Sequence, residues 1–188
     1  MNAAVIFLGN KRVKNVKKKA KTVHRPYGQS FHAVQILKES YDDKDPFLIY
    51  EADEGQTTGL PYVIKSSKRK LEVMENLDCT GDHSLNQTVV HLDVIHGRTK
   101  EFKTYTLSYY DTRLMMMIVL CVMDTISECK EACTLFFKKI NEMLNKFVSQ
   151  RDPNSPRKKP YKFNPFHIKD DEHGGNKIGM ANVFGKPD

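Results

Sequence analysis

Residues 113–124 read RLMMMIVLCVMD, with ten consecutive apolar residues between Arg113 and Asp124. This run is far shorter than the ~20 residues that a helix needs to cross a bilayer. It does not alternate, as a strand with one face in water would. We therefore expect a buried strand covered on both faces, whose flexible methionines fill gaps in the core. If Met115 or Met117 is exposed, the same stretch is also a partner surface.

Two alternating segments precede this run. In TVVHLDVI (88–95), Val90, Leu92 and Val94 share one face, and in FKTYTLSYY (102–110) every second residue is again apolar. The connection HGRTK (96–100) contains a glycine, as hairpin turns do. Together with the run at 114–123, these segments predict a three-strand antiparallel meander.

An amphipathic helix is predicted after the meander, from Ser127 to about Val148. Asp124, Thr125 and Ser127 are candidate N-cap residues, and Glu128 suits the first turn. The apolar residues form a single stripe at helical spacing, which predicts a helix packed on the sheet. They are Cys129, Cys133, Phe136, Phe137, Ile140, Met143, Leu144 and Phe147.

The remaining segments give weaker patterns. We expect a short helix from Ser30 to Leu37 or Ser40, and a strand in PFLIYEA (46–52). PYVIKSSKRKLEVMENL (61–77) predicts two strands around a basic turn at Ser66–Lys70. The division is an N-terminal segment with a basic arm (1–29), a single α+β domain (30–150) and an irregular basic and aromatic tail (151–188).

Charge is distributed unevenly along the chain. The first 25 residues carry eight Lys or Arg and no acid, residues 26–150 carry a net charge of −4, and residues 151–188 carry +3. This pattern indicates basic arms on a mildly acidic folded body. The four cysteines and the absence of a basic n-region before the first apolar run favour free thiols in a reducing compartment.

The basic arm contains KRVK (11–14) and KKAK (18–21), which fit the pattern that nuclear import receptors read. Such an arm also binds nucleic-acid phosphates, with an affinity that falls steeply with salt. The alternative is a solvated charge run or a contact to an acidic partner. The candidate binding residues are Lys11, Arg12, Lys14, Lys17, Lys18, Lys19 and Lys21, supported by Arg157, Lys158 and Lys159.

Two further groups carry binding hypotheses. Lys65, Lys68, Arg69 and Lys70, at the predicted turn, are candidates for phosphate contact in a lipid headgroup or a nucleic acid, with a merely soluble turn as the alternative. Aromatic residues follow the basic residues at 157–159 and are candidates for docking on a partner or on the body, or for stacking on bases. They are Tyr161, Phe163 and Phe166.

Metal binding and catalysis are not favoured. Cys129 and Cys133 fall on the apolar helix stripe, where cysteine behaves as a small hydrophobe, so we expect no metal site and no cofactor. No GxSxG, P-loop, GxGxxG or HExxH motif occurs in the chain. These observations favour a protein that is not an enzyme.

A meander followed by a capping helix is an α+β arrangement that resembles two known folds. One is the pleckstrin-homology-like fold, a seven-strand sandwich closed by a C-terminal helix, which we adopt as the expectation. The other is the longin or sybindin-like fold, a five-strand sheet with helices on its faces. YTLSYYDTRLMMMIVLCVMD (105–124) and the helix after it resemble the sybindin hairpin-to-helix region, and DPNSP (152–156) falls where such chains leave the helix.

These patterns lead to three hypotheses. The first is a non-enzymatic interaction subunit of a nuclear nucleoprotein assembly, whose body binds another subunit and whose arm contacts DNA or RNA. The second is a longin-type subunit of a cytosolic vesicle-trafficking complex, and the third is a phosphoinositide-binding module. None of the three requires a transmembrane segment.

Overall fold

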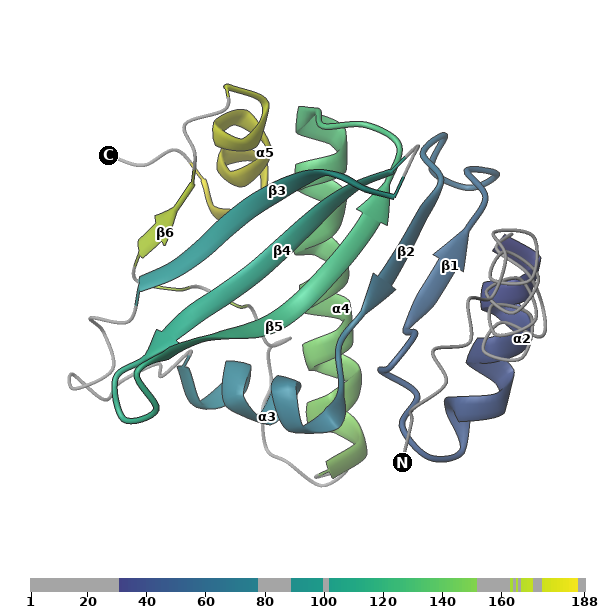
Figure 1. The fold of residues 1–188 in the computed structure, drawn as a ribbon, viewed down its shortest axis with the longest axis horizontal. Coiled ribbons are helices and arrows are strands. Elements are labelled where there is room, and N and C mark those ends of the chain that lie inside the picture. Colours follow the sequence, from purple (N-terminus) through teal and green to yellow (C-terminus); the bar gives the residue numbers. More distant parts are fainter. Residues whose placement is uncertain are drawn as a thin grey trace, which may run out of the picture.

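The computed structural model describes residues 31–77, 89–99, 102–151, 163, 165, 167–170 and 174–185. These residues form a mixed α+β fold, with one open six-stranded sheet of order β1-β2-β5-β4-β3-β6. Figure 1 shows the sheet with the long helix α4 behind it and α2 beside the β1 edge. The described part of the chain therefore has two layers.

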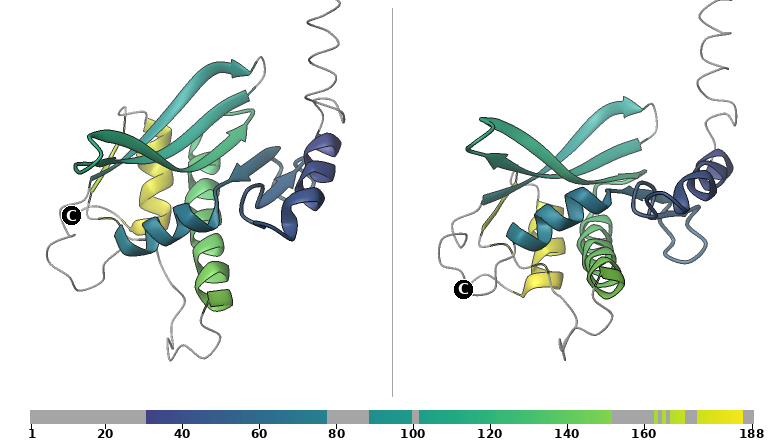
Figure 2. Two further views of the ribbon diagram at one scale, coloured as in Figure 1. Left: turned by 60° about the horizontal axis from the view of Figure 1, so that its bottom comes forward. Right: turned by 90° about the horizontal axis from the view of Figure 1, so that it is seen from below.

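The strands are β1 (Glu51–Asp53), β2 (Tyr62–Lys65), β3 (Val89–Thr99), β4 (Phe102–Asp111), β5 (Met116–Thr125) and β6 (His167–Lys169). The helices are α2 (Phe31–Asp42), α3 (Lys68–Leu77), α4 (Lys130–Arg151) and α5 (Gly174–Phe184). Viewed from below the sheet, α3, α4 and α5 all lie on one side of it (Figure 2). We call this side the helix face and the other side the outer face.

The predicted meander is confirmed, because β3, β4 and β5 are consecutive antiparallel strands. The β4–β5 ladder contains a bulge, since Leu107 pairs with Cys121 whereas the next residue, Ser108, pairs with Val119. Leu120 is thus an extra residue on β5. A bulge bends the strand and increases its twist, and here it divides β5 into two halves.

The predicted C-terminal helix is also confirmed as α4. All its stripe residues except the half-buried Cys129, which precedes the helix, are buried in the core. Phe136 contacts Tyr105 of β4, with ring centroids 5.8 Å apart. The Cys133 amide donates to the Cys129 carbonyl over 3.0 Å, so the first turn begins beyond the predicted Ser127. This helix covers the middle of the sheet.

The prediction of two strands in residues 61–77 is wrong in its second half, which is helix α3. Ser67 caps that helix, since the Lys70 amide donates to its hydroxyl over 3.3 Å. Leu71 and Met74, three residues apart, are fully buried against the body. That spacing suits a helix that packs by one face. The basic residues therefore lie at a helix N-terminus, not on a hairpin tip.

The N-terminal part of the body matches the prediction only in part. The expected helix is present as α2. The expected strand at 46–52 begins only at Glu51, because Phe47 and Ile49 are buried within turns. The Phe47 amide donates to Asp45 Oδ1 over 3.1 Å, which is a local turn contact that replaces strand pairing.

The prediction of an irregular C-terminal tail is wrong for residues 167–169 and 174–184. Strand β6 pairs in parallel with the start of β3. Helix α5 packs on α4 at Gly179, where an added Cβ would lie 2.5 Å from Cys133 Cβ. Phe184 of α5 also contacts Phe137, with ring centroids 5.0 Å apart. Glycine permits this close helix approach, which the Gly-rich composition conceals.

The expectation that β5 is covered on both faces is wrong as well. Helices α3, α4 and α5 cover only the helix face, and Met116 and Met117 are 51% and 43% exposed. Within the described residues, no helix is long and apolar enough to cross a membrane. The α+β class is therefore established, together with a sheet whose outer face carries no described layer.

Candidate functional site

The outer face is built from cross-strand rows of side chains. One row joins Lys65, Val122, Thr106 and Asp93 across β2, β5, β4 and β3. A neighbouring row joins Val63, Asp124, Thr104 and Ile95 in the same way. These rows mix aliphatic and polar groups, unlike the apolar helix face, so the outer face suits a partner with both kinds of group.

Small hydroxyl side chains occupy the central strand of this face. Thr104, Thr106 and Ser108 are at most 8% exposed. Thr104 donates to Asp124 Oδ1 over 2.7 Å, and Asp124 also holds Lys65. The Thr106 hydroxyl is buried without a hydrogen-bond partner among the described residues. The polar groups on the central strand are therefore closely packed among their neighbours.

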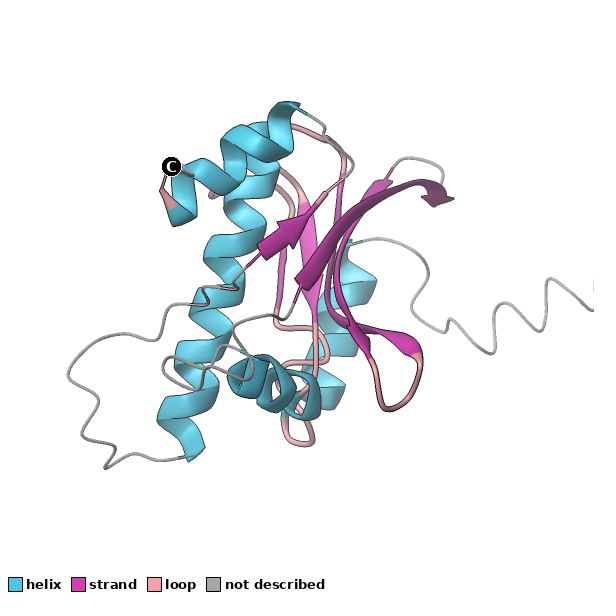
Figure 3. Cartoon of the chain, turned by 90° about the vertical axis from the view of Figure 1, so that its left-hand side faces the viewer, coloured by secondary structure: helices cyan, strands magenta, loops and turns pink. Residues whose placement is uncertain are grey.

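The turn of the β4–β5 hairpin is the most exposed apolar feature. Leu114, Met115, Met116 and Met117 are 62%, 73%, 51% and 43% exposed, in that order. We call these four residues the methionine tip. The loop joining β4 and β5 stands clear of the helices in Figure 3. The tip is exposed because the helix layer ends before it.

Asp111 organises the backbone of the turn. Its Oδ1 accepts hydrogen bonds from the amides of Arg113 and Leu114, over 2.9 and 3.1 Å. Its Oδ2 accepts from the Tyr109 hydroxyl over 3.0 Å. The Leu114 amide is the main cause that lowers the pKa of this carboxyl below its usual range. The turn is therefore held by a charged acceptor.

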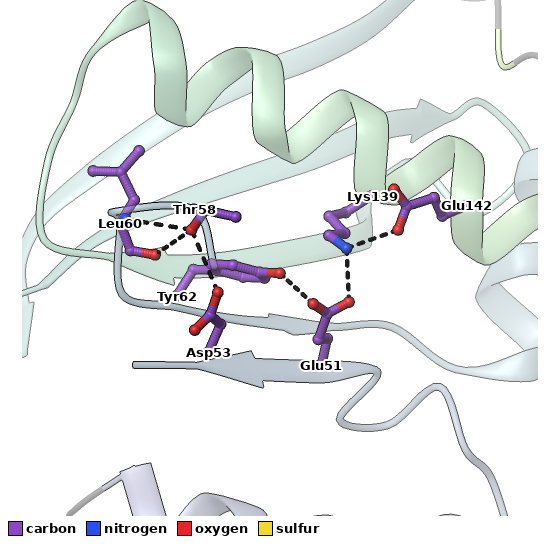
Figure 4. A network of polar contacts seen from close by, with 7 residues as sticks. All are labelled: Glu51, Asp53, Thr58, Leu60, Tyr62, Lys139 and Glu142. Carbon is purple, nitrogen blue, oxygen red and sulfur yellow. Dashed lines mark hydrogen bonds and ion pairs between the residues drawn. The ribbon is translucent and has the colours of Figure 1, made fainter. Parts of the chain in front are cut away.

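A second polar cluster ties the sheet edge to α4 (Figure 4). Lys139 of α4 donates to Glu51 Oε2 and Glu142 Oε2, each over 2.8 Å. The Tyr62 hydroxyl donates to Glu51 Oε1. Asp53 orders the adjacent loop by accepting the Gly55 amide over 2.9 Å. We call Glu51, Tyr62, Lys139 and Glu142 the edge clamp.

The pKa values of the edge clamp fit a structural role rather than proton transfer. Burial, followed by the hydrogen bond to Glu51, raises the pKa of Tyr62 well above its usual value. Burial alone would lower the pKa of Lys139, but the carboxylates of Glu142 and Glu51 outweigh it and raise that pKa. Tyrosine and lysine then both keep their protons near neutral pH. A general acid or base needs a pKa near the working pH, which neither group has.

A surface hollow of about 280 Å³ lies next to the clamp, between the loop before β2, the start of α4 and the end of α5. Its lining includes Thr58, Leu60, Lys130, Thr134 and Asn182. Thr58 donates to the Leu60 carbonyl over 2.9 Å, and Asn182 donates to Thr134 over 3.3 Å. These polar groups satisfy one another, so the hollow presents no convergent set for a ligand.

The structure separates the predicted basic residues. The arm residues 11–21 and Arg157, Lys158 and Lys159 lie outside the described residues. Lys65 is paired with Asp124 on the outer face. Lys68 donates through Nζ to the Lys44 carbonyl over 3.3 Å, and Lys68 and Arg69 are exposed. Of these four residues, Lys65 and Lys68 therefore already have partners within the protein.

The aromatic candidates have different locations. Phe163 is 1% exposed and belongs to the core of the body. Its amide donates to Asn141 Oδ1 of α4 over 2.7 Å. Tyr161 and Phe166 lie outside the described residues. The sequence left open docking on a partner, docking on the body and stacking on bases. Phe163 docks on the body.

The three cysteines that the structure describes show no metal-binding arrangement. Cys121 and Cys133 are buried free thiols, and burial raises the pKa of the Cys133 thiol to about 12. A protonated thiol is a poor metal ligand. Across the ranges that the structure describes, no group of three or more His, Cys, Asp or Glu side chains is positioned to hold a metal ion.

Sequence reasoning missed the outer face and the edge clamp for different reasons. The pairing of β2 with β5 joins residues about sixty positions apart, so no local pattern places Lys65 beside Asp124. Lys139 stands between apolar stripe residues of α4, and that position was a usable sign that its side chain meets the sheet. For the methionines, the sequence predicts burial and allows exposure of Met115 or Met117 only as an alternative.

No family model, curated protein or solved structure matches this chain.

Proposed function

We propose that this protein is a non-enzymatic interaction subunit of a nuclear nucleoprotein assembly. In this proposal another protein subunit packs on the outer face, and the basic arm contacts nucleic acid and directs nuclear import. The observation that carries the first half is the outer face of the sheet, on which α3, α4 and α5 do not lie and where Ile95 is 38% exposed. The charge distribution of the sequence supports the second half.

The outer face supports protein binding better than small-molecule binding. Its central strand, β4, carries buried threonine and serine side chains. Valine and isoleucine side chains flank this strand, and Ile95 is 38% exposed. A subunit that brings its own hydrogen-bond donors and aliphatic groups would satisfy both features.

The test is affinity purification of the full chain at two salt concentrations. Proteins bound through the outer face persist at high salt, whereas nucleic acid bound by the arm is lost. An Ile95→Glu variant is expected to lose the salt-resistant partner, and Ile178→Glu on α5 is the matched control, because Ile178 is also exposed. Retention of the same partner by Ile95→Glu would contradict the proposal.

The arm is tested separately. Replacing Lys17, Lys18 and Lys19 by Gln is expected to reduce nucleic-acid recovery and nuclear accumulation without changing the melting temperature. If neither property responds, the nucleic-acid and import roles of the arm are wrong. The salt-resistant partner should be unaffected in this variant, which separates the two halves of the proposal.

A longin-type subunit of a cytosolic trafficking complex is the second candidate. One open sheet with five antiparallel strands and a short β6 suits that fold better than a seven-strand sandwich of the pleckstrin-homology kind. This candidate expects a cytoplasmic location both for the intact chain and after deletion of the arm. Fluorescence imaging of the two forms therefore discriminates between the candidates.

A phosphoinositide-binding role receives less support. Lys65 is engaged by Asp124, and Lys68 donates to the Lys44 carbonyl. The test is co-sedimentation of the protein with lipid vesicles. If binding shows no preference for phosphoinositide headgroups, the phosphoinositide-binding hypothesis is wrong.

A further inference from the structure

The methionine tip is exposed on both faces of its hairpin. Met117 pairs with Tyr110 on the outer face, whereas Met116 pairs with Asp111 and so lies on the helix face. Both methionines are nevertheless about half exposed. Leu114 and Met115 form the turn between the strands and are more exposed still. An environment that covers this tip must enclose it from two sides.

We propose that the methionine tip inserts into the interfacial region of an anionic lipid bilayer. This inference does not rest on the proposed function. A flat protein surface would cover only one side of the hairpin, whereas a bilayer would surround an inserted hairpin on both sides. The four side chains together expose roughly 450 Å² on the basis of typical side-chain areas, which is as large as the largest apolar patch on many monomers.

The backbone of the turn is prepared for an apolar medium. Unsatisfied amides are costly in lipid, so an inserted loop must bond its own polar groups. Asp111 accepts the amides of Arg113 and Leu114, and its other oxygen accepts the Tyr109 hydroxyl. The carboxylate is thereby turned away from solvent, since the Asp111 side chain is 7% exposed. Its charge is offset by Arg113, whose Nη2 lies 3.7 Å from Asp111 Oδ2.

The exposed member of the Arg113–Asp111 ion pair is the cation, which has the sign that an anionic bilayer attracts. Asp111 is the only acidic residue between 109 and 123. The Arg113 side chain is 89% exposed, and a long cationic side chain can reach headgroups while its neighbours insert. Tyr110 is 43% exposed beside Met117, and tyrosine favours the boundary between lipid and water.

The turn also maintains an unfavourable backbone conformation. Met115 has φ of 54°, a left-handed value that favours glycine or asparagine. The chain thus accepts both a strained backbone and an exposed methionine at one position. Strain of this kind is often associated with a functional role. Here it directs an apolar side chain outward at the end of the hairpin.

The absence of tryptophan from the chain gives a direct test. A Leu114→Trp variant of the full chain carries one tryptophan at the tip. Its emission is expected to shift to shorter wavelength with vesicles of phosphatidylcholine and phosphatidylserine, and to be quenched by brominated lipids. An Ile126→Trp variant is the matched control, because Ile126 is 49% exposed just beyond the opposite end of β5. Its emission should not change.

High salt distinguishes the tip from the basic arm. Arm binding is electrostatic and is lost at high salt, whereas the inserted tip should keep the shifted emission. Without salt, Arg113→Gln in the Leu114→Trp background is expected to weaken binding about fivefold. Replacing Met115 and Met116 by Ser in the same background is expected to abolish the shift.

Two results would overturn the inference. One is an unchanged tryptophan emission with vesicles at any salt concentration. The other is an emission shift only when the salt-resistant protein partner is added, which would identify the tip as part of the protein interface. The second result would leave the proposed interaction function intact.

Discussion

The two halves of β5 have similar sequences and opposite environments. Met123, in the half after the bulge, is fully buried beneath α4, whereas Met116, on the same helix face in the half before the bulge, is 51% exposed. Both residues lie in one apolar run, so composition does not set the difference. The helix layer sets it, because α4 covers the middle of the sheet and no described helix covers the hairpin end. A methionine stabilises the fold only where a second layer meets it.

The largest expected effect tests this comparison directly. Met123→Ala should lower the free energy of unfolding by about 2–5 kcal/mol, because it leaves a cavity in a closed core. Met116→Ala, at the exposed end of the same face, should change that free energy by at most about 0.5 kcal/mol. Chemical denaturation of both variants measures the difference. Equal losses would mean that the tip is packed in solution.

The contact between α4 and α5 extends the comparison to another covered surface. Gly179→Ala should lower the free energy of unfolding by about 1–3 kcal/mol, because the new methyl group meets Cys133 Cβ and the Lys130 carbonyl. Gly174→Ala is the control in the same helix, where an added Cβ meets nothing within 4 Å. Thermal unfolding should separate the two variants. A neutral Gly179→Ala would show that α5 does not dock on α4.

The edge clamp should contribute less. Lys139→Met is expected to cost about 1–2 kcal/mol, because Glu51 and Glu142 lose a charged hydrogen-bond donor. Lys138→Met, at the exposed neighbouring position, should be nearly neutral.

The clamp also predicts a pH dependence. The pKa values of Lys139 and Tyr62 are raised in the folded protein, so their contribution is complete below the unfolded values near 10. It is lost as the pH rises through the folded values. Stability should therefore fall above pH ~10, and this fall should be shallower in Lys139→Met. An identical alkaline limb in the variant and the wild type would exclude this role.

The smallest expected effect lies in the hairpin turn. The folded pKa of Asp111 is lowered, so its contribution is present above the unfolded pKa and is lost as the pH falls through the folded value. Asp111→Asn should therefore flatten the acid limb of the stability profile below pH ~4. Melting temperatures measured across that range check this expectation. A changed neutral-pH stability with an unchanged acid limb would contradict it.

The sequence could predict the elements whose signals are local. Alternation gave β3 and β4, and the helical stripe gave α4, because each element buries one face that its own residues encode. Helix α3 was predictable in principle from Ser67 as a cap and from Leu71 and Met74 at helical spacing. Helix α5 was not predictable in this way. Gly179 packs closely on Cys133, which is far away in the sequence, so no local pattern indicates the contact.

The candidate sites were less predictable than the fold. An apolar run indicates that its side chains tend to be buried, but it does not indicate which of them another element covers. The exposure of Met116 on the helix face depends on where the helix layer ends, and that of Met117 on what covers the outer face. The edge clamp joins residues of the first strand and the long helix, and the pairing of Glu51 with Lys139 follows only from the assembled sheet.

The bulge at Leu120 has a consequence for how this chain tolerates insertions and deletions. One extra residue in β5 shifts the inward positions from odd numbers, such as Cys121 and Met123, to even numbers, such as Ile118. Loss of a single residue there would exchange the side chains of the two faces along half the strand. The number of residues in β5 between the hairpin turn and α4 therefore determines which methionine reaches the surface. The kind of apolar residue in that strand matters less.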